Sequence, residues 1–157
     1  MIWPMTTTVN GIAGLKEKIG QHLGYSDWVE ITQERVNTFA DATGDHQWIH
    51  VDPERAAKES PFGGPIAHGY LTLSLGPLLM PQILRVDGIK MGVNYGAGKV
   101  RFPSPVPVGA KLRLGAELVS VEDVGGGGAQ VTMLFSFQVE DAPKPSCVAE
   151  IIFRYYE

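Results

Sequence analysis

Residues 68–84, HGYLTLSLGPLLMPQIL, carry large apolar side chains on nearly every face that a helix would present. A helix that is apolar all round must be buried, so we expect this segment to form the centre of the domain. Pro77 predicts a kink in the helix, and Pro81 lies near its expected end. The rest of the fold must therefore be built around residues 68–84.

The segments on either side of this helix predict an α+β fold. Before it, apolar spacing and capping residues predict helices over 11–22, 33–43 and 53–59 and a short strand within 27–31. After it, alternating residues favour strands at about 89–102, 111–124, 129–140 and 147–156, with the glycines at 125–128 as a flexible hairpin connection. One long apolar helix wrapped by a strongly curved antiparallel sheet resembles the hot-dog fold.

The composition limits the classes of function. A length of 157 residues fits a single domain, 1–157, in which we expect residues 1–10 to be a poorly ordered N-terminal extension. Only 19% of residues are charged, which indicates a surface partly covered by a partner, and we expect a homodimer. A net charge of −4 without a Lys/Arg cluster argues against nucleic acid. Cys147, with apolar neighbours, is expected to be a buried strand residue.

Signals for export or membrane insertion are lacking in the sequence. The first residues do not combine a basic start with a long apolar run, and the apolar segment at 68–84 is interrupted by Gly76, Pro77 and Pro81. We therefore expect no membrane span and a cytoplasmic protein.

The segment ATGDHQWIHVD, residues 42–52, gathers ionisable side chains between two predicted helices. Asp45 and His50 are five positions apart, and a regular helix or strand would separate them. A turn beginning at Gly44 brings them together, and Trp48 and Ile49 give the loop apolar side chains with which to bury itself. A carboxylate and an imidazole that face one space can hold and polarise a water molecule for addition to an activated double bond.

The first turn of the central helix can supply the remaining element of such a site. Free backbone N–H groups near Gly69, at the positive end of the helix, can stabilise negative charge on a substrate carbonyl oxygen. Structural roles stay open for each residue: Asp45 can cap a turn, His50 can be a hydrogen-bonded structural histidine, and His68 can either line the site or fix the entry of the helix. The histidines lack the spacing and the second cluster typical of zinc ligands, so we expect no metal.

Two motifs together resemble the MaoC-like dehydratases, the (R)-specific enoyl-CoA hydratases. They are FADATGDHQWIHVD at 39–52, with a His five residues after Gly-Asp, and GGPIAHGYLTLSL at 63–75, with a His-Gly helix start; KVRFPSPVPVGAKL at 99–112 is similar to a strand and turn of the same family. The N-terminal helix looks like that of a nodulation protein N-like subgroup. The resemblance implies a hot-dog enzyme that reversibly hydrates trans-2-enoyl-CoA to (R)-3-hydroxyacyl-CoA without a cofactor, since coenzyme A is part of the substrate.

The resemblance also assigns expected roles to residues. Asp45 would act as the base toward the water, His50 as its partner and proton donor, and the N–H of Gly69 would donate to the thioester carbonyl. Gln47 and Trp48 replace the Asn and Pro common in this family loop, which alters its shape; Gln47 still offers an amide. We expect the substrate-binding surface to include His68, Gln47, Trp48 and Tyr70, and the coenzyme A phosphates to meet Lys99 and Arg101, which otherwise form a solvated edge.

Two other functions stay open. One is hydrolysis of the thioester, since hot-dog proteins also include thioesterases; that reaction predicts a carboxylate on the central helix, and residues 68–84 contain none. The other is a non-catalytic subunit that binds acyl thioesters, for which Asp45 and His50 would be dispensable.

Overall fold

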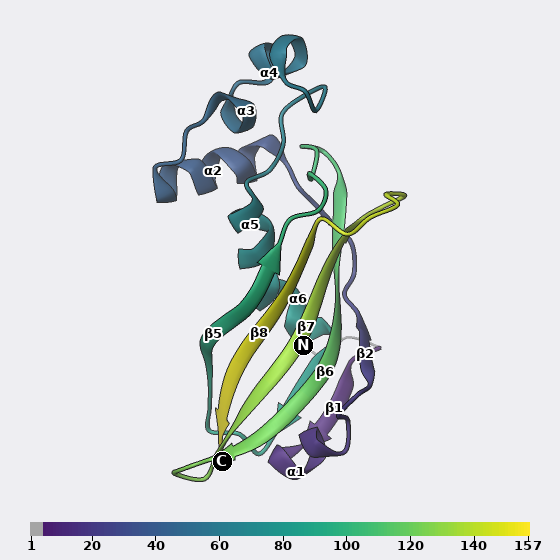
Figure 1. Cartoon of the computed structure of the whole chain (residues 1–157), viewed down its shortest axis with the longest axis vertical. Helices are drawn as coiled ribbons and strands as arrows, with labels where there is room; N and C mark the ends of the chain where they lie inside the picture. Colours follow the sequence, from purple (N-terminus) through teal and green to yellow (C-terminus); the bar gives the residue numbers. More distant parts are fainter. Residues whose placement is uncertain (1–4) are drawn as a thin grey trace.

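The computed structural model describes residues 5–157 as helices and short turns packed on a long curved sheet (Figure 1). The helices are α1 (Gly11–Lys16), α2 (Gln33–Thr43), α3 (Trp48–Val51), α4 (Pro53–Glu59), α5 (Gly69–Ser74) and α6 (Gly76–Leu79), followed by a 3-10 turn, η1 (Met80–Gln82). The strands are β1 (Thr7–Asn10), β2 (His22–Tyr25), β3 (Val29–Glu30), β4 (Leu84–Asp87), β5 (Met91–Arg101), β6 (Lys111–Val124), β7 (Gly128–Val139) and β8 (Cys147–Tyr156). None of the helices in this part of the chain is long and apolar enough to cross a bilayer.

The main sheet has the strand order β2-β6-β7-β8-β5, with β3 also paired to β6, and its neighbouring strands are antiparallel. It curves around α5 and α6, as the hot-dog prediction requires (Figure 1). Alternate residues of β7, from Val131 through Met133 and Phe135 to Phe137, are buried and form much of the core. The four C-terminal strands agree with the predicted ones to within two residues at every end.

The hairpin between β6 and β7 forms at the predicted glycines. Gly126 and Gly127 have φ values of +75° and +73°, and two successive positive φ angles give the turn a twist that matches the flanking strands. Cys147 is buried in β8, as predicted, and burial raises the pKa of its thiol to about 11.

The central helix differs from the continuous buried helix that we predicted. It is divided at Leu75 into α5 and α6, and Pro77 stands in the first turn of α6, where its missing N–H costs no hydrogen bond. Its burial is also one-sided: Leu71 and Leu75 pack in the core, whereas Tyr70 is 73% exposed and Leu78 is 50% exposed. The apolar residues on the outer face therefore lie on a surface.

The N-terminal prediction was wrong in two respects. The helix expected over 11–22 ends at Lys16, because Gly20 turns the chain and residues 22–25 are recruited as β2 onto β6. Residues 7–10, expected to be disordered, form β1 and pair in parallel with β4. The first four residues of the expected extension lie outside the described residues. At the other end of the chain, Glu157 accepts a hydrogen bond from the backbone N–H of Ile12 at 2.7 Å, which closes the start of α1.

The helices before the central helix follow their predicted capping signals. Thr32 accepts a hydrogen bond from the N–H of Arg35 at 3.1 Å to begin α2, and Gly44, with φ +83°, ends it. Asp52 caps α4 in the same way. In Figure 1, α2, α3 and α4 lie together beyond the amino end of α5, so they carry residues 45–50 to that end of the central helix.

Candidate active site

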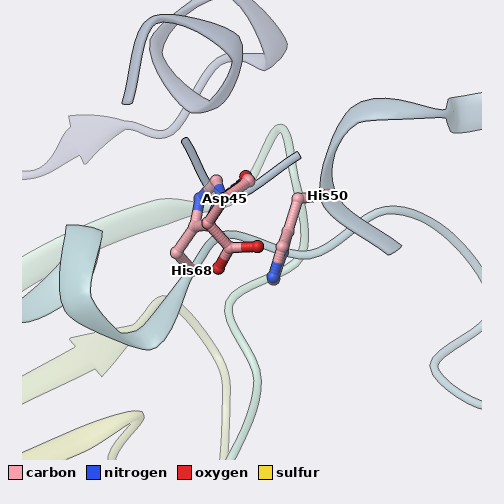
Figure 2. A group of neighbouring side chains, drawn as sticks. All are labelled: Asp45, His50 and His68. Carbon is pink, nitrogen blue, oxygen red and sulfur yellow. Dashed lines mark hydrogen bonds between the residues drawn. The ribbon is translucent and has the colours of Figure 1, made fainter. Parts of the chain in front are cut away.

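Asp45, His50 and His68 meet at the amino end of α5. Each offers one ligand-type side-chain atom, and these atoms all lie within 4.8 Å of one another. Asp45 comes from the loop after α2, His50 from α3, and His68 directly precedes α5. Figure 2 shows the carboxylate of Asp45 pointing toward the imidazole of His50. The structure thus brings together the two residues that the sequence predicted as a pair, and adds His68 beside them.

His50 is buried and held in one tautomer. Its Nδ1 lies 2.6 Å from the backbone carbonyl oxygen of Ile66, which can only accept, so Nδ1 carries the proton and Nε2 has the free lone pair. Burial lowers the pKa of His50, the facing His68 lowers it further, and the Ile66 hydrogen bond and Asp45 oppose this shift. A neutral His50 in this tautomer must accept a proton before it can donate one.

Asp45 combines a role in the turn with a position in the site. Its Oδ1 accepts a weak hydrogen bond from the N–H of Gln47 at 3.3 Å, and its own N–H donates to the Thr43 hydroxyl at 3.4 Å. The residue is otherwise exposed. The Asp45 carboxylate and the His50 ring nitrogen lie within 4.8 Å of each other, a distance that one water molecule can bridge with two hydrogen bonds.

His68 connects the loop to the central helix, as one of its two predicted roles requires. Its Nε2 donates to the backbone carbonyl oxygen of Asp45 at 2.9 Å. Its ring stacks on His50, with centroids 3.9 Å apart and planes inclined by 25°, and its other neighbour is the ring of Phe39 at 4.9 Å. Each histidine donates one ring N–H to a backbone carbonyl, which leaves the other nitrogen of each neutral ring as an acceptor.

Gly69 is the first residue of α5, where backbone N–H groups have no partner within the helix. A Cβ atom at this position would lie only 3.0 Å from the ring of Phe102. The ring of Phe102 in turn meets Tyr70 edge-on, with centroids 6.1 Å apart. The position therefore favours glycine because a neighbouring aromatic ring covers it.

An apolar cavity of about 880 Å³ lies between the α5–α6 helices and the strands β5, β7 and β8. Its lining includes Phe39, whose ring contacts His68, and Gly76 of α6. A second cavity of about 250 Å³ lies beside Gly69 and includes Phe62 and Phe102. The larger one is mainly lined by apolar side chains, among them Leu73, Met80, Leu84, Phe135, Ile151, Phe153 and Tyr155.

The other predicted site residues lie at the margin. Gln47 is an exposed residue at the start of α3, and Trp48 is half-buried with the guanidinium of Arg55 stacked 4.3 Å from its ring. Tyr70 is exposed at the rim of the larger cavity. Lys99 and Arg101 lie on β5 just before Phe102, and neither forms an ion pair within residues 5–157.

Sequence reasoning missed two features of this site. Phe39 and Phe102, which enclose His68 and Gly69, were not singled out, since an aromatic residue in a helix or before a proline gives no sign of what it covers. The carbonyl oxygens of Ile66 and Asp45 were also missed, because every residue carries one.

This chain is similar to known proteins over most of its length. The family model for the MaoC-like domain matches residues 15–135. The 3-hydroxyacyl-thioester dehydratase Z of Mycobacterium tuberculosis is 57% identical, over 94% of this chain and 97% of that protein. Nodulation protein N of Rhizobium leguminosarum is 43% identical over 90% and 88%.

Solved structures give the same result for the fold. The R-hydratase PhaJ1 from Pseudomonas aeruginosa superposes with a TM-score of 0.73 at 25% identity, over 94% of this chain and 86% of that one. A second (R)-hydratase, from A. caviae, superposes with a TM-score of 0.65. These likenesses confirm the hot-dog fold, and with the family match they show that the chain is an enzyme that belongs to the MaoC-like dehydratase family.

Proposed function

We propose that the protein reversibly hydrates trans-2-enoyl-CoA thioesters to (R)-3-hydroxyacyl-CoA. The observation that carries the proposal is the pairing of the Asp45 carboxylate with a buried His50 whose Nε2 is free, at the amino end of α5. The similarity to a 3-hydroxyacyl-thioester dehydratase and to R-hydratases supports the substrate class and the stereochemistry.

The reaction proceeds through a water molecule held between the two side chains. His50 Nε2, with Asp45 beside it, takes a proton from the water as its oxygen bonds to C3 of the substrate. The π electrons of the C2–C3 double bond move to the thioester oxygen and form an enolate. The protonated His50, stabilised by the Asp45 carboxylate, then gives the proton to C2, and the carbonyl re-forms. This order departs from the predicted roles, in which Asp45 is the base toward the water, because His50 with its proton on Nδ1 must accept a proton on Nε2 before it can donate one there.

The enolate oxygen needs a hydrogen-bond donor, and the backbone N–H of Gly69 is the proposed one. The acyl chain would occupy the apolar cavity along α5 and α6, past Tyr70 at its rim. Lys99 and Arg101 are the proposed partners of the coenzyme A phosphates, since both are cationic, exposed and close in sequence to Phe102, which covers Gly69. We propose no resident cofactor or metal, because the thioester itself activates the double bond.

A homodimer is the proposed assembly, formed through β5. This strand ends the sheet order, nearly all of its residues are exposed, and it presents Met91, Val93 and Tyr95 at 53%, 40% and 52% exposure. A long exposed edge strand with apolar side chains is a template for pairing with another strand, and an identical antiparallel copy satisfies both edges. The cytoplasmic location predicted from the sequence stays a prediction.

The alternatives make different predictions for the same side chains. A thioesterase would release free coenzyme A, and a non-catalytic subunit would bind thioesters equally well without Asp45 or His50. The central helix carries no carboxylate to support hydrolysis, which favours hydration.

The test follows loss of the conjugated enoyl-CoA absorbance over a series of acyl lengths, with chiral analysis of the product and a thiol assay for free coenzyme A. Asp45→Asn and His50→Ala should each lower kcat by about 10²–10⁴-fold. The matched controls are Asp41→Asn and His46→Ala, which remove the same groups from an exposed 2.9 Å pair outside the site and should leave kcat unchanged.

Release of coenzyme A, wild-type protein that hydrates no acyl length, or Asp45 and His50 variants as active as these controls would refute the proposed reaction. For the dimer, light scattering should show two chains for the wild type and one for Val93→Lys; an unchanged mass for that variant would refute pairing through β5.

A further inference from the structure

The two chain segments that form the site are tied to each other by three hydrogen bonds. The N–H of Ile66 donates to the carbonyl oxygen of Ile49 at 3.0 Å, and His50 Nδ1 donates to the carbonyl oxygen of Ile66 at 2.6 Å. His68 Nε2 donates to the carbonyl oxygen of Asp45 at 2.9 Å. Each histidine therefore fixes itself on the backbone of the other one's segment.

This reciprocal arrangement places His68 against both members of the pair. Its hydrogen bond holds the main-chain carbonyl of Asp45. The other bonds of Asp45 within residues 5–157 are weaker ones to its own turn: its N–H donates to Thr43 at 3.4 Å, and its carboxylate accepts from the N–H of Gln47 at 3.3 Å. Its ring lies flat against His50 at 3.9 Å, which sets the plane in which His50 Nε2 is presented. Both contacts involve parts of Asp45 and His50 that do not react.

Packing alone does not explain a histidine at position 68. The side chain is 3% exposed, and its Nδ1 is buried without a hydrogen-bond partner among the described residues. An unpaired buried nitrogen costs free energy, and a phenylalanine would stack between Phe39 and His50 without that cost. What a phenylalanine cannot supply is the Nε2–H donor toward Asp45.

We infer that His68 is a positioning residue for the hydration reaction, holding the Asp45 main chain by its Nε2–H and the plane of His50 by its ring. This inference rests on the proposed function of the Asp45–His50 pair. Pre-organisation of this kind acts on the chemical step, because a displacement of about 1 Å can cost about 10²-fold in rate. Substrate affinity should change little, since His68 is not placed against the thioester.

Three variants separate the two contacts. His68→Phe keeps the ring and removes the donor, His68→Gln keeps a donor near the Nε2 position and removes the stack, and His68→Ala removes both. We expect each of the first two to lower kcat by roughly 10-fold and His68→Ala by roughly 100-fold, with KM within about 3-fold of wild type. The same three substitutions at His46, an exposed histidine paired with Asp41, are the matched controls and should leave both constants unchanged.

The acidic limb of the pH–rate profile is a readout that a merely structural role would not move. His50 faces Asp45 and His68, and the nearby His68 helps to keep its pKa low. In His68→Ala and His68→Gln the acidic limb should move to higher pH, whereas His68→Phe, which preserves burial, should move it less. Thermal unfolding of each variant identifies any that fail to fold. The kinetic constants of the folded variants then test the inference, together with NMR of the wild-type protein.

Nitrogen NMR of the wild-type imidazoles tests the arrangement without any reaction. We expect His68 to carry its proton on Nε2 and His50 on Nδ1, in slow exchange with water. A His68 protonated on Nδ1 would overturn the inference, as would folded His68 variants with wild-type kcat or with a loss confined to KM. If wild-type protein hydrates no thioester, the proposed function fails, while the NMR result still decides whether His68 holds the loop.

Discussion

The Gly69→Ala variant tests the role of the backbone at the start of α5. The added Cβ would lie 3.0–3.1 Å from three carbon atoms of the Phe102 ring, whereas carbon atoms pack at about 3.5–4.0 Å. The ring must therefore retreat by about 0.5 Å or more. Phe102 is 42% exposed, so it can move outward, and the cost should fall near the lower end of the roughly 1–3 kcal/mol typical of overpacking.

The effect on catalysis should exceed the effect on stability. An alanine in a helix recovers up to about 1 kcal/mol relative to glycine, so the free energy of unfolding should change by about 1 kcal/mol or less. Loss of one preorganised donor to the enolate oxygen costs about 10²–10³-fold in kcat. Alanine keeps the backbone N–H, but its methyl group would displace the Phe102 ring that covers this position and narrow the space beside the N–H, so we expect a fall of up to that size in kcat/KM.

Enoyl-CoA hydration and urea unfolding, measured on the same preparation, give both quantities. Gly64→Ala is the control, because its Cβ would meet nothing within 4 Å and its φ is not left-handed. A double variant, Gly69→Ala with Phe102→Ala, removes the ring that the added methyl group would otherwise contact. It should restore stability but not activity. A Gly69→Ala protein with wild-type kcat/KM, or a double variant with full activity, would refute the proposed approach of the thioester to this backbone.

Three further outcomes are expected. Burial lowers the pKa of His50, so the acidic limb of the kcat/KM profile should lie below the ordinary value of 6.5, and a limb above 6.5 would contradict this. The free energy of unfolding should also fall as the pH drops below 6.5, because the unfolded chain then binds the His50 proton more readily than the folded one. In Gly76→Val the new side chain would press on Phe135, 3.1 Å from its Cβ, and fill part of the cavity. The kcat/KM for long-chain enoyl-CoA should then fall about 10-fold more than the kcat/KM for crotonyl-CoA. Equal losses for the two substrates would argue against an acyl chain in this cavity. Thr32→Ala should lower the free energy of unfolding by about 1 kcal/mol in urea with kcat unchanged, whereas Thr38→Ala, a mid-helix hydroxyl, should not destabilise α2.

The elements that local chemistry specifies were predictable from the sequence. Thr32 and Gly44 bound α2 because a hydroxyl satisfies an amide at one end and a glycine adopts a left-handed conformation at the other. The long strands were visible because one face of each is buried, which forces alternation. The pair Asp45 and His50 could also be predicted from the sequence. The two residues are five positions apart, and at that spacing only a turn brings their side chains together.

The elements that depend on distant partners were not predictable. Ile12, Leu15, Ile19 and Leu23 have the apolar spacing of a helix, but Gly20 turns the chain and β6 offers residues 22–25 an edge, where strand pairing outweighs helix propensity. Residues 7–10 carry the strand-forming side chains of Thr7, Thr8 and Val9, but four residues are too short a signal by themselves, and they form a strand by pairing with β4. The exposure of Tyr70 on α5 was also not predictable. An apolar residue in a sequence indicates burial, but it does not tell whether the same chain or another molecule covers it.

The exposed apolar residues of α5, α6 and β5 lie on a surface that a second chain could cover, in agreement with the low charge of the chain. Tyr70, Leu78 and Tyr95 are each at least half exposed, and Tyr70 and Tyr95 also line the larger cavity. In one chain, therefore, part of the wall of the proposed acyl site is also open surface. A second copy paired along β5 would cover that surface and exclude water from the cavity in one step, so assembly and substrate binding should be coupled. The scarcity of charge predicted a partner, and these aromatic residues mark where the proposed second copy would lie beside the site.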